Sequence, residues 1–381
     1  MSVPPFALWQ TAICMFMRLC PKRRRLRVSR LICCFFVNSH PNISHYLEIM
    51  KRRDFLELCA AMAVAPFVPG KVLAAFDESK RPRSVAPLNI KNITVKLNCE
   101  KAFSALHISD THLAMVDNRD NERKMKLAAA RSRIFPNAEH YLDESVEYAK
   151  KNDMMLIHTG DLIDFTTERN LDCASSHIMG DNVIASAGNH EYSQYVGEAK
   201  EDEAYKQQSY AAVQEVFPNN LVFYSKVVNG VNFVAIDDIY YNVTEHQHEL
   251  VEQEMKKGLP VVLLCHVPLY TPKHAEYAMK RNDNGAAYVT GAPLSITSTY
   301  KNDPSLPESQ QWRNRGVQQR ADKPTLEFVK WLKKQKQLKA ILCGHCHYFY
   351  EERFSPTAMQ YIVGANYDGA AYNVRFEGWT L

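Results

Sequence analysis

The sequence contains no apolar run long enough to cross a bilayer, no internal repeat and no low-complexity tract. A membrane-spanning helix needs roughly 20 apolar residues, so no transmembrane helix is expected. With 381 residues and 46% hydrophobic content, the chain can bury a full core. This composition excludes the disordered and fibrous classes, and it predicts no particular oligomeric state.

Most of the chain carries no excess of basic side chains. The formal net charge is +4, but residues 1–49 hold seven Lys or Arg against one acid, and residues 50–75 hold four against two. Residues 76–381 therefore carry 35 basic and 39 acidic side chains. Bulk charge thus gives no indication of a surface that follows a nucleic-acid backbone.

Cysteines do not form a disulfide pattern. Five of the ten lie before residue 76, and the other five are an odd number at irregular spacing. Cys343 and Cys346 have the Cys-x-x-Cys spacing of some zinc and redox proteins. The chain lacks a second such pair, and Cys343 falls inside an apolar segment, which favours a buried structural thiol.

Residues 50–75 have the order of an export signal. Met50 is followed by basic residues that include Arg52-Arg53, by an apolar stretch over 58–68 and by an Ala-rich end. The arginine pair resembles the twin-arginine type. We expect translation to start at Met50, residues 1–49 to be an upstream extension or a basic leader, and the protein to be exported to the periplasm. If the signal is not used, the protein stays in the cytoplasm.

After a predicted linker over 76–97, the chain alternates short apolar runs with amphipathic segments, as in an α/β domain. We predict strands at Ala102–Ile108, Met154–His158, Val183–Ala187, Val231–Ile236, Val261–Leu264 and Ala340–Leu342. Helices are predicted after Pro136-Asn137, from Thr244 to Gly258, and from Pro324. Asn229-Gly230 predicts a hairpin, so the sheet is mixed.

Five short motifs follow the carboxyl ends of predicted strands, where open α/β sheets build their sites. In chain order they are Asp110-Thr111-His112, Gly160-Asp161-Leu162-Ile163-Asp164, Gly188-Asn189-His190-Glu191, Cys265-His266-Val267-Pro268 and Gly344-His345-Cys346-His347. Carboxylate, amide and imidazole groups suit Zn, Fe and Mn. A carboxylate can bridge two cations ~4 Å apart by offsetting their repulsion. Glycines before the ligands let the backbone turn sharply. The motifs therefore predict two divalent or trivalent metal ions.

Together the motifs resemble the calcineurin-like metallophosphoesterase family, as in an exported bacterial member, from about Ala102 to the C-terminus. The family pattern is Asp-x-His, Gly-Asp-x-x-Asp, Gly-Asn-His-Asp/Glu, a lone His and Gly-His-x-His. The resemblance implies that residues 98–381 form a four-layer α/β/β/α sandwich with two mixed sheets. Purple acid phosphatases have Asp-x-Gly first and a Tyr near the Asp164 position. This chain has neither feature, which argues against that subclass.

The resemblance also implies roles for the matching residues. One metal ion would take Asp110, His112 and His347, the other would take Asn189, His266 and His345, and Asp161 would bridge them. His190 would face the substrate, as a general acid for the leaving oxygen or as a donor to the phosphoryl oxygens. Asp164 and Glu191 would orient neighbouring imidazoles.

We therefore expect hydrolysis of a small-molecule phosphate ester, either a monoester or a diester, by a hydroxide that bridges the two metal ions. Asp161 and His190 are the residues closest to the reaction in this interpretation. The alternative from another class is a non-catalytic, metal-stabilised binding protein with the same fold. The complete ligand set together with His190 favours the enzyme.

Two segments outside the motifs are candidate walls of the site. Residues 273–323 are longer than a plain connection requires, and we expect them to overhang the site. Candidate substrate contacts in this insert are Tyr300, Trp312, Arg313 and Arg315. The alternative is a solvated loop with a few buried anchors. Residues 114–136 are the second candidate wall.

Overall fold

The computed structural model describes residues 85–196, 202–282, 285–301 and 316–378. The predicted extension, the signal segment and the first part of the linker lie outside these residues. Within the described ranges, no helix combines the length and the apolar character needed to cross a membrane.

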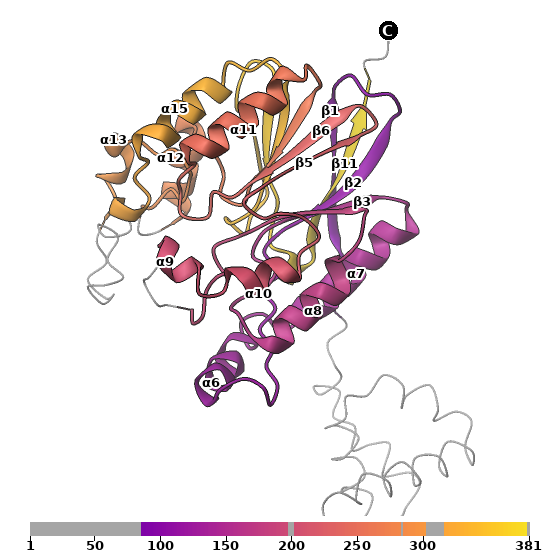
Figure 1. The fold of residues 1–381 in the computed structure, drawn as a ribbon, viewed down its shortest axis with the longest axis vertical. Coiled ribbons are helices and arrows are strands. Elements are labelled where there is room, and N and C mark those ends of the chain that lie inside the picture. The colour runs from indigo at the N-terminus through magenta and orange to yellow at the C-terminus, as the bar shows by residue number, and fades with distance from the viewer. Residues whose placement is uncertain (1–84, 197–201, 283–284, 302–315, 379–381) are drawn as a thin grey trace, which may run out of the picture. The chain divides into compact units, whose positions relative to one another are not determined.

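Two mixed sheets form the centre of the domain (Figure 1). The first has the strand order β1 (Asn89–Lys96), β11 (Ala370–Glu377), β2 (Phe103–Ile108), β3 (Met155–Thr159) and β4 (Val183–Ser186). Only the β11–β2 pair is antiparallel there. The second has the order β5 (Phe223–Val228), β6 (Val231–Ile236), β7 (Val261–Leu264), β8 (Leu338–Cys343), β10 (Met359–Ile362) and β9 (Tyr350–Arg353). Its outer strands β5 and β9 run antiparallel to their neighbours.

The sheets pack face to face because alternate residues of each strand point inward. Ala105 and Ile157 of the first sheet share one buried cluster with Phe233 and Leu264 of the second. The neighbouring residue Leu106 points the other way, into a cluster on the outer face of the first sheet. Each sheet is therefore apolar on both faces and needs a cover on its outer side.

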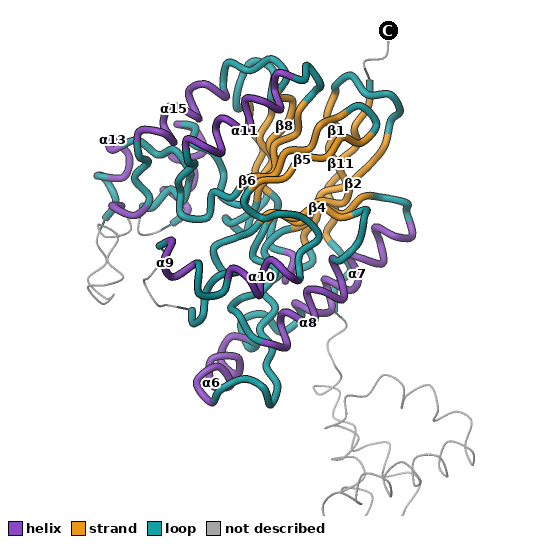
Figure 2. The backbone as a smooth tube through the Cα atoms, viewed as in Figure 1, coloured by secondary structure: helices purple, strands orange, loops and turns teal. Residues whose placement is uncertain are grey.

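Helices supply that cover, which gives four layers (Figure 2). The first sheet's outer cluster includes apolar residues of α7 (Ala138–Lys151), α8 (Glu168–Ile178) and α10 (Tyr210–Glu215). The second sheet's outer cluster includes apolar residues of α11 (Glu245–Lys256) and α15 (Lys323–Leu332). The predicted α/β/β/α sandwich with two mixed sheets is confirmed.

Local signals in the sequence account for several element ends. The hydroxyl of Thr244 accepts the Gln247 backbone N–H, and the Gln247 side chain accepts that of Thr244, so α11 starts with a capping box. Asn229 and Gly230 both have positive φ, 50° and 77°, as a two-residue turn between β5 and β6 requires.

The predicted linker over 76–97 is wrong in its second half. Residues 89–96 are strand β1, which pairs in parallel with β11 at the end of the chain. The alternation of β1 is weak because only Ile93 and Val95 of the strand are buried. The described fold thus starts well before residue 98.

The remaining elements surround the sandwich. Helix α6 (Glu122–Arg131) lies in the second candidate wall, residues 114–136, where Ala128 packs on Ala114 and Phe165. The insert contains α12 (Pro272–Arg281) and α13 (Leu294–Thr297) and has a small core of its own. The others are α9 (Glu203–Lys206) and the 3-10 helix η4 (Asn366–Asp368).

Candidate metal centre

The five motifs meet where the carboxyl ends of strands from both sheets come together. Asp110, Asp161 and Asn189 follow the adjacent strands β2, β3 and β4, while His266 and His345 follow the adjacent strands β7 and β8. Backbone hydrogen bonds join neighbouring motifs within each sheet. The N–H of Asp110 donates to Gly160, and that of Gly344 donates to His266, at 2.9 and 3.0 Å. Sheet topology thus brings together motifs that lie far apart in the sequence.

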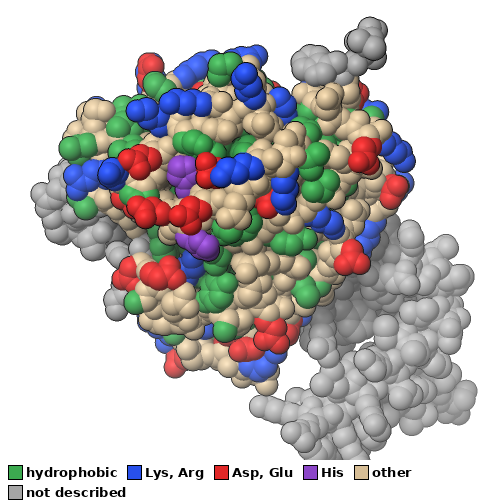
Figure 3. Space-filling model, turned by 45° about the horizontal axis from the view of Figure 1, so that its top comes forward, with side chains coloured by type: hydrophobic (Ala, Val, Ile, Leu, Met, Phe, Trp, Pro, Cys, Tyr) green, Lys and Arg blue, Asp and Glu red, His purple; other side chains and the backbone are tan. Residues whose placement is uncertain are grey.

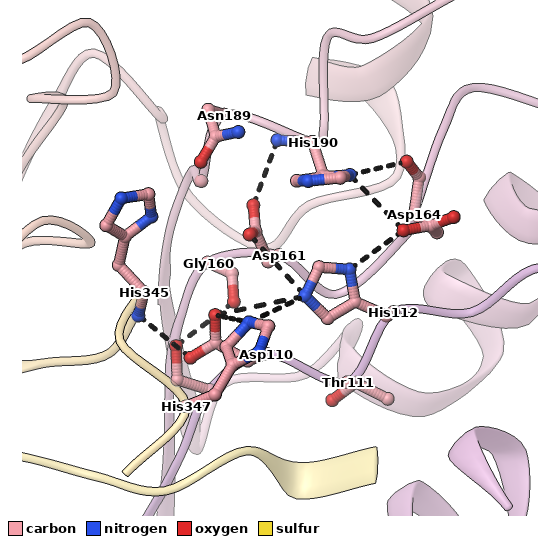
Figure 4. A network of polar contacts seen from close by, with 12 residues as sticks. Asp110, Thr111, His112, Gly160, Asp161, Asp164, Asn189, His190, His345 and His347 are labelled. Carbon is pink, nitrogen blue, oxygen red and sulfur yellow. Dashed lines mark hydrogen bonds and ion pairs between the residues drawn. The ribbon is translucent and has the colours of Figure 1, made fainter. Parts of the chain in front are cut away.

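The predicted ligands form two groups that share one residue. Side-chain donor atoms lie within 4.8 Å of one another in the group Asp110, His112, Asp161 and His347 and in the group Asp161, His266 and His345. Figure 4 shows Asp161 in the middle, with Asn189 and His345 to one side and His112 to the other. This is the division that the resemblance implies.

Asp161 presents a single oxygen to both groups. Its Oδ1 accepts the backbone N–H of His190 at 2.9 Å. Its Oδ2 lies 3.7 Å from Nε2 of His112 and 3.2 Å from Nε2 of His266. The carboxylate is therefore fixed at one oxygen, and the other is placed between the two imidazoles.

Two buried oxygens among the predicted ligands have no hydrogen-bond donor. Asp110 Oδ2 accepts the backbone N–H of His345 at 2.9 Å, but among the described residues neither Asp110 Oδ1 nor Asn189 Oδ1 has a hydrogen-bond donor. Buried acceptors without a donor are costly. Both oxygens belong to residues predicted to bind metal, so the donor set fits two cations.

The ligand residues have strained backbone conformations. Five of them have φ between 53° and 67°, namely Asp110, His112, Asp161, His345 and His347. Residues other than glycine rarely adopt this region, and such outliers gather at functional sites. The tips of β2, β3 and β8 are therefore shaped by the site.

The glycines before the ligands serve two different needs. Gly160 has φ +93°, so the predicted sharp turn holds there. Gly188 and Gly344 do not have positive φ, and they are required for space. A Cβ would lie 2.2 Å from Oδ1 of Asp161 at Gly188 and 2.5 Å from Oδ2 of Asp110 at Gly344. The backbone of these two glycines packs directly on the ligand carboxylates.

The charges in the centre suit cation binding. Burial opposes it, but His266 and His190 hold the pKa of Asp161 well below its usual value. Burial, with the charge of His266, lowers the pKa of His345 to about 3, and burial also lowers that of His112. Anionic carboxylates and neutral imidazoles are the forms that bind metal, so Asp161, His345 and His112 suit it. His266 differs, because burial lowers its pKa but Asp161 and Asp110 raise it to about 10, and metal binding there would release a proton.

Asp164 is the partner of two imidazoles, as predicted, and of an arginine that the sequence did not indicate. Its Oδ1 lies 3.0 Å from Nδ1 of His112 and 3.3 Å from Nδ1 of His190. Arg131 of α6 donates from Nε to Oδ2 at 2.5 Å and from Nη2 to Oδ1 at 2.7 Å. Although burial raises it, the pKa of Asp164 lies far below its usual range because of Arg131 and the imidazoles.

Glu191 contacts the backbone of the motif loops and not an imidazole. Its carboxylate accepts backbone N–H groups of Asp161, Leu162, Ile163 and Gly188 at 2.5 to 3.3 Å. Glu191 thus holds two motif loops through their backbone, and its carboxylate accepts from no imidazole among the contacts of the described residues. Sequence spacing could not distinguish a backbone acceptor from an imidazole partner.

Tyr300 does not lie where a substrate contact was predicted. It is 7% exposed, lies in the core of the insert and donates its hydroxyl hydrogen bond to Gln319 at 3.0 Å. It is a buried anchor, as in the alternative interpretation of the insert. Trp312, Arg313 and Arg315 lie outside the described residues. The insert does reach the centre through Tyr288, whose ring centroid lies 5.9 Å from that of His345.

Aromatic residues around the ligands had no motif to reveal them. Phe135 stacks on His112 with centroids 4.6 Å apart, and the Tyr367 hydroxyl lies 3.1 Å from Nδ1 of His347. The Tyr241 hydroxyl lies 3.1 Å from Nε2 of His345. Tyr241 follows β6, so its position just past a predicted strand was the one available signal.

The surface agrees with the bulk charge. On the face drawn in Figure 3, acidic and basic side chains are intermixed. That face therefore gives no indication of a nucleic-acid surface.

Several solved structures resemble this chain at low identity. A dimetal phosphatase from Danio rerio has 12% identity and a TM-score of 0.38, over 72% of this chain and 92% of its own. A purple acid phosphatase from yellow lupin (Lupinus luteus) has 13% identity and a TM-score of 0.39, over 71% of this chain and 45% of its own. A 5'-nucleotidase from Candida albicans has 14% identity and a TM-score of 0.35, over 74% of this chain and 48% of its own.

Among curated sequences, no protein matches this chain. The sequence model described as calcineurin-like phosphoesterase matches residues 103–349, which include all five motifs and nearly two thirds of the chain. The protein therefore belongs to the calcineurin-like phosphoesterase family.

Proposed function

We propose that this protein hydrolyses small-molecule phosphate esters with two bound metal ions. The observation that carries the proposal is Oδ2 of Asp161, which faces His112 of one ligand group and His266 of the other. A shared carboxylate oxygen between two sets of imidazoles is the arrangement that two neighbouring cations need. Among the described residues the Oδ1 atoms of Asp110 and Asn189 accept no hydrogen bond, so Asp110 of the first group has a free acceptor and Asn189 adds one to the second.

Each metal ion would be held by its own set of side chains, and one further side chain would contact both ions. Asp110, His112 and His347 would hold the first, Asn189, His266 and His345 would hold the second, and Asp161 would contact both. The mixture of imidazole nitrogens with carboxylate and amide oxygens suits Mn, Fe or Zn.

The protein's part in the reaction is to hold these groups in place. Two such ions, when bound, would supply Lewis-acid chemistry that makes a water molecule a stronger nucleophile and offsets negative charge on the phosphoryl oxygens. The N–H of His190 fixes the Asp161 carboxylate, and Asp164 fixes the His112 ring. The site thus needs little rearrangement at the moment of reaction.

We propose that His190 acts on the leaving oxygen. Its Nδ1 donates to the backbone oxygen of Asp164 at 2.7 Å, which fixes the ring and leaves Nε2 for a substrate. The His190 side chain is 18% exposed, so Nε2 can meet a ligand. Burial lowers the pKa of His190, but Asp161 and Asp164 raise it to about 10.

Hydrolysis of p-nitrophenyl phosphate and bis-p-nitrophenyl phosphate with added Mn or Zn tests the function. We expect turnover by the full chain and loss of both bound metal and turnover in Asp161→Asn. A matched control is Asp153→Asn, because Asp153 is exposed and lies before the opposite end of β3. Equal metal content and activity in Asp161→Asn and the control would contradict the proposal.

The same assay separates the enzyme from its main alternative. A wild-type protein that binds metal but cleaves neither substrate would favour the metal-stabilised binding protein. The preferred substrate distinguishes a monoesterase from a diesterase.

The proposed role of His190 predicts a dependence on the leaving group. General acid catalysis contributes about 10²–10⁴-fold. His190→Ala should therefore lose about that factor in kcat for an alkyl phosphate, and less for p-nitrophenyl phosphate, whose leaving group needs little protonation. An equal loss for both esters would assign His190 to the phosphoryl oxygens, and full activity would remove it from the mechanism.

We also propose export through the signal-like segment that starts at Met50. The support is the order of charged, apolar and Ala-rich residues over 50–75. Mass spectrometry of the mature N-terminus is the test, and a peptide that begins before Met50 would overturn the proposed start.

A further inference from the structure

The ring of His345 has a different partner at each nitrogen. Its Nδ1 lies 3.1 Å from Nε2 of His266, in the group that contains Asp161. Its Nε2 points the other way and lies 3.1 Å from the hydroxyl of Tyr241. One nitrogen is thus directed at the candidate metal position and the other at a phenol.

His347 repeats this arrangement with its nitrogens exchanged. Its Nε2 lies 3.3 Å from Oδ1 of Asp110 and 3.2 Å from Nε2 of His112. Its Nδ1 lies 3.1 Å from the hydroxyl of Tyr367. Two histidines that are two residues apart therefore face different ligand groups, and each contacts its own tyrosine.

The other two imidazoles of the centre have partners of the usual kinds. Nδ1 of His112 lies 3.0 Å from the Asp164 carboxylate, and Nδ1 of His266 lies 2.7 Å from the backbone oxygen of Thr159. A histidine that binds metal nearly always donates its other N–H to such an acceptor, which fixes the tautomer and the ring orientation. For His345 and His347, phenol oxygens occupy the acceptor positions.

Both tyrosines are held in place by the backbone of the site. Tyr241 is 5% exposed, has φ 64°, and donates its N–H to Asp238 at 2.9 Å. Tyr367 lies in η4 and donates its N–H to the backbone oxygen of Asp110 at 3.3 Å. Its ring also packs on Phe135 with centroids 4.7 Å apart. Each hydroxyl therefore has a defined position beside its imidazole.

We infer that Tyr241 and Tyr367 are positioning residues, each orienting one metal-binding histidine of the Gly-His-x-His motif. This inference rests on the proposed two-metal function. Tyr241 accepts the Nε2–H of His345, and Tyr367 accepts the Nδ1–H of His347. Each tyrosine thus acts on one metal position, Tyr241 on that of His266 and Tyr367 on that of His112.

The test measures metal affinity in the absence of substrate. Metal-free full-length protein is titrated with Zn²⁺ in competition with a chromophoric chelator, which gives a dissociation constant for each of the two sites. The variants are Tyr241→Phe, Tyr367→Phe and the double variant, which keep the rings. The control is Tyr372→Phe, because Tyr372 is a fully buried tyrosine between the sheets whose hydroxyl donates to Glu351.

We expect each single variant to weaken one site by about 10- to 100-fold, the usual effect of losing such a partner. The double variant should weaken both sites, and Tyr372→Phe should change neither. Near-ultraviolet circular dichroism of the metal-free proteins monitors folding independently of binding.

The outcomes separate the inference from the function on which it rests. If the wild type binds two ions and hydrolyses ester but the single variants bind Zn²⁺ as it does, the inference is wrong and the function stands. Equal weakening by Tyr372→Phe would also overturn the inference, because the effect would then be general. If the wild type binds no metal, both fail.

Discussion

Replacement of Arg131 by Met tests how the second candidate wall supports the metal centre. Arg131 is the last residue of α6, and its guanidinium forms a two-point contact with Asp164. Asp164 in turn holds the rings of His112 and His190. Methionine keeps much of the apolar part of the Arg131 side chain and lacks the guanidinium, so the substitution tests the ion pair with Asp164.

The expected loss of stability follows from burial. Removing one partner of a fully buried ion pair costs about 3–5 kcal/mol. The Asp164 side chain is fully buried, but that of Arg131 is 21% exposed, so water can replace part of the contact. Asp164 also keeps its two imidazole partners. We therefore expect the free energy of unfolding to fall by about 2 kcal/mol, or about 30-fold in the equilibrium constant.

The loss should also depend on pH in a defined direction. Burial raises the folded-state pKa of Asp164, but its contacts lower it more, and Arg131 is the first of them. A lowered carboxyl pKa stabilises the fold above the unfolded value of about 3.9, and this contribution is lost as pH falls toward the folded value. The difference between wild type and Arg131→Met should thus be constant from about pH 5 to 8 and shrink below about pH 4.

Urea unfolding of metal-free protein in a chelating buffer measures this difference without a contribution from bound ions. The matched control is Arg119→Met, because Arg119 contacts Asp117 and Asp172 on the exposed surface. It should change stability little. A midpoint for Arg131→Met equal to that of Arg119→Met would refute the assigned role of the Arg131–Asp164 pair.

Three further changes have definite expected outcomes. Gly188→Ala would place a Cβ 2.2 Å from a ligand carboxylate, so metal content and turnover should both fall, measured by elemental analysis and ester hydrolysis. Thr244→Ala removes the α11 cap and should cost about 1 kcal/mol in urea unfolding. Contacts with Cys173 and Asp143 raise the pKa of His177 to about 9. Because that stabilisation is complete below about pH 6.5 and lost through pH 9, His177→Gln should destabilise more at pH 6 than at pH 10.

Sequence reasoning succeeded where local signals decide the structure. The strand at Val231–Ile236 and the hairpin at Asn229-Gly230 are set by apolar patterning and by turn residues that accept positive φ. The ligands could be placed because each follows a strand end, and the carboxyl ends of neighbouring parallel strands meet at one edge. Such features need only a few adjacent residues to be recognised.

Features that depend on a contact with a residue far away in the sequence could not be predicted. β1 pairs with β11 from the other end of the domain, and a half-exposed edge strand has little apolar alternation of its own. The contacts of Arg131 with Asp164 and of Tyr367 with His347 join separate loops. Glu191 was assigned to an imidazole because its acceptance of backbone N–H groups leaves no mark on the sequence.

The strained backbone of the ligand residues requires buried groups that hold it in place. Left-handed backbone costs about 1–2 kcal/mol at a residue with a side chain, and five ligand residues adopt it. Such conformations persist only when the surroundings fix them. Glu191 supplies this for Asp161, because its carboxylate accepts the N–H groups of Asp161, Leu162 and Ile163 after β3 together with that of Gly188 after β4. These supports come from the protein's own backbone and side chains, so the fold itself fixes the positions of the groups around Asp161.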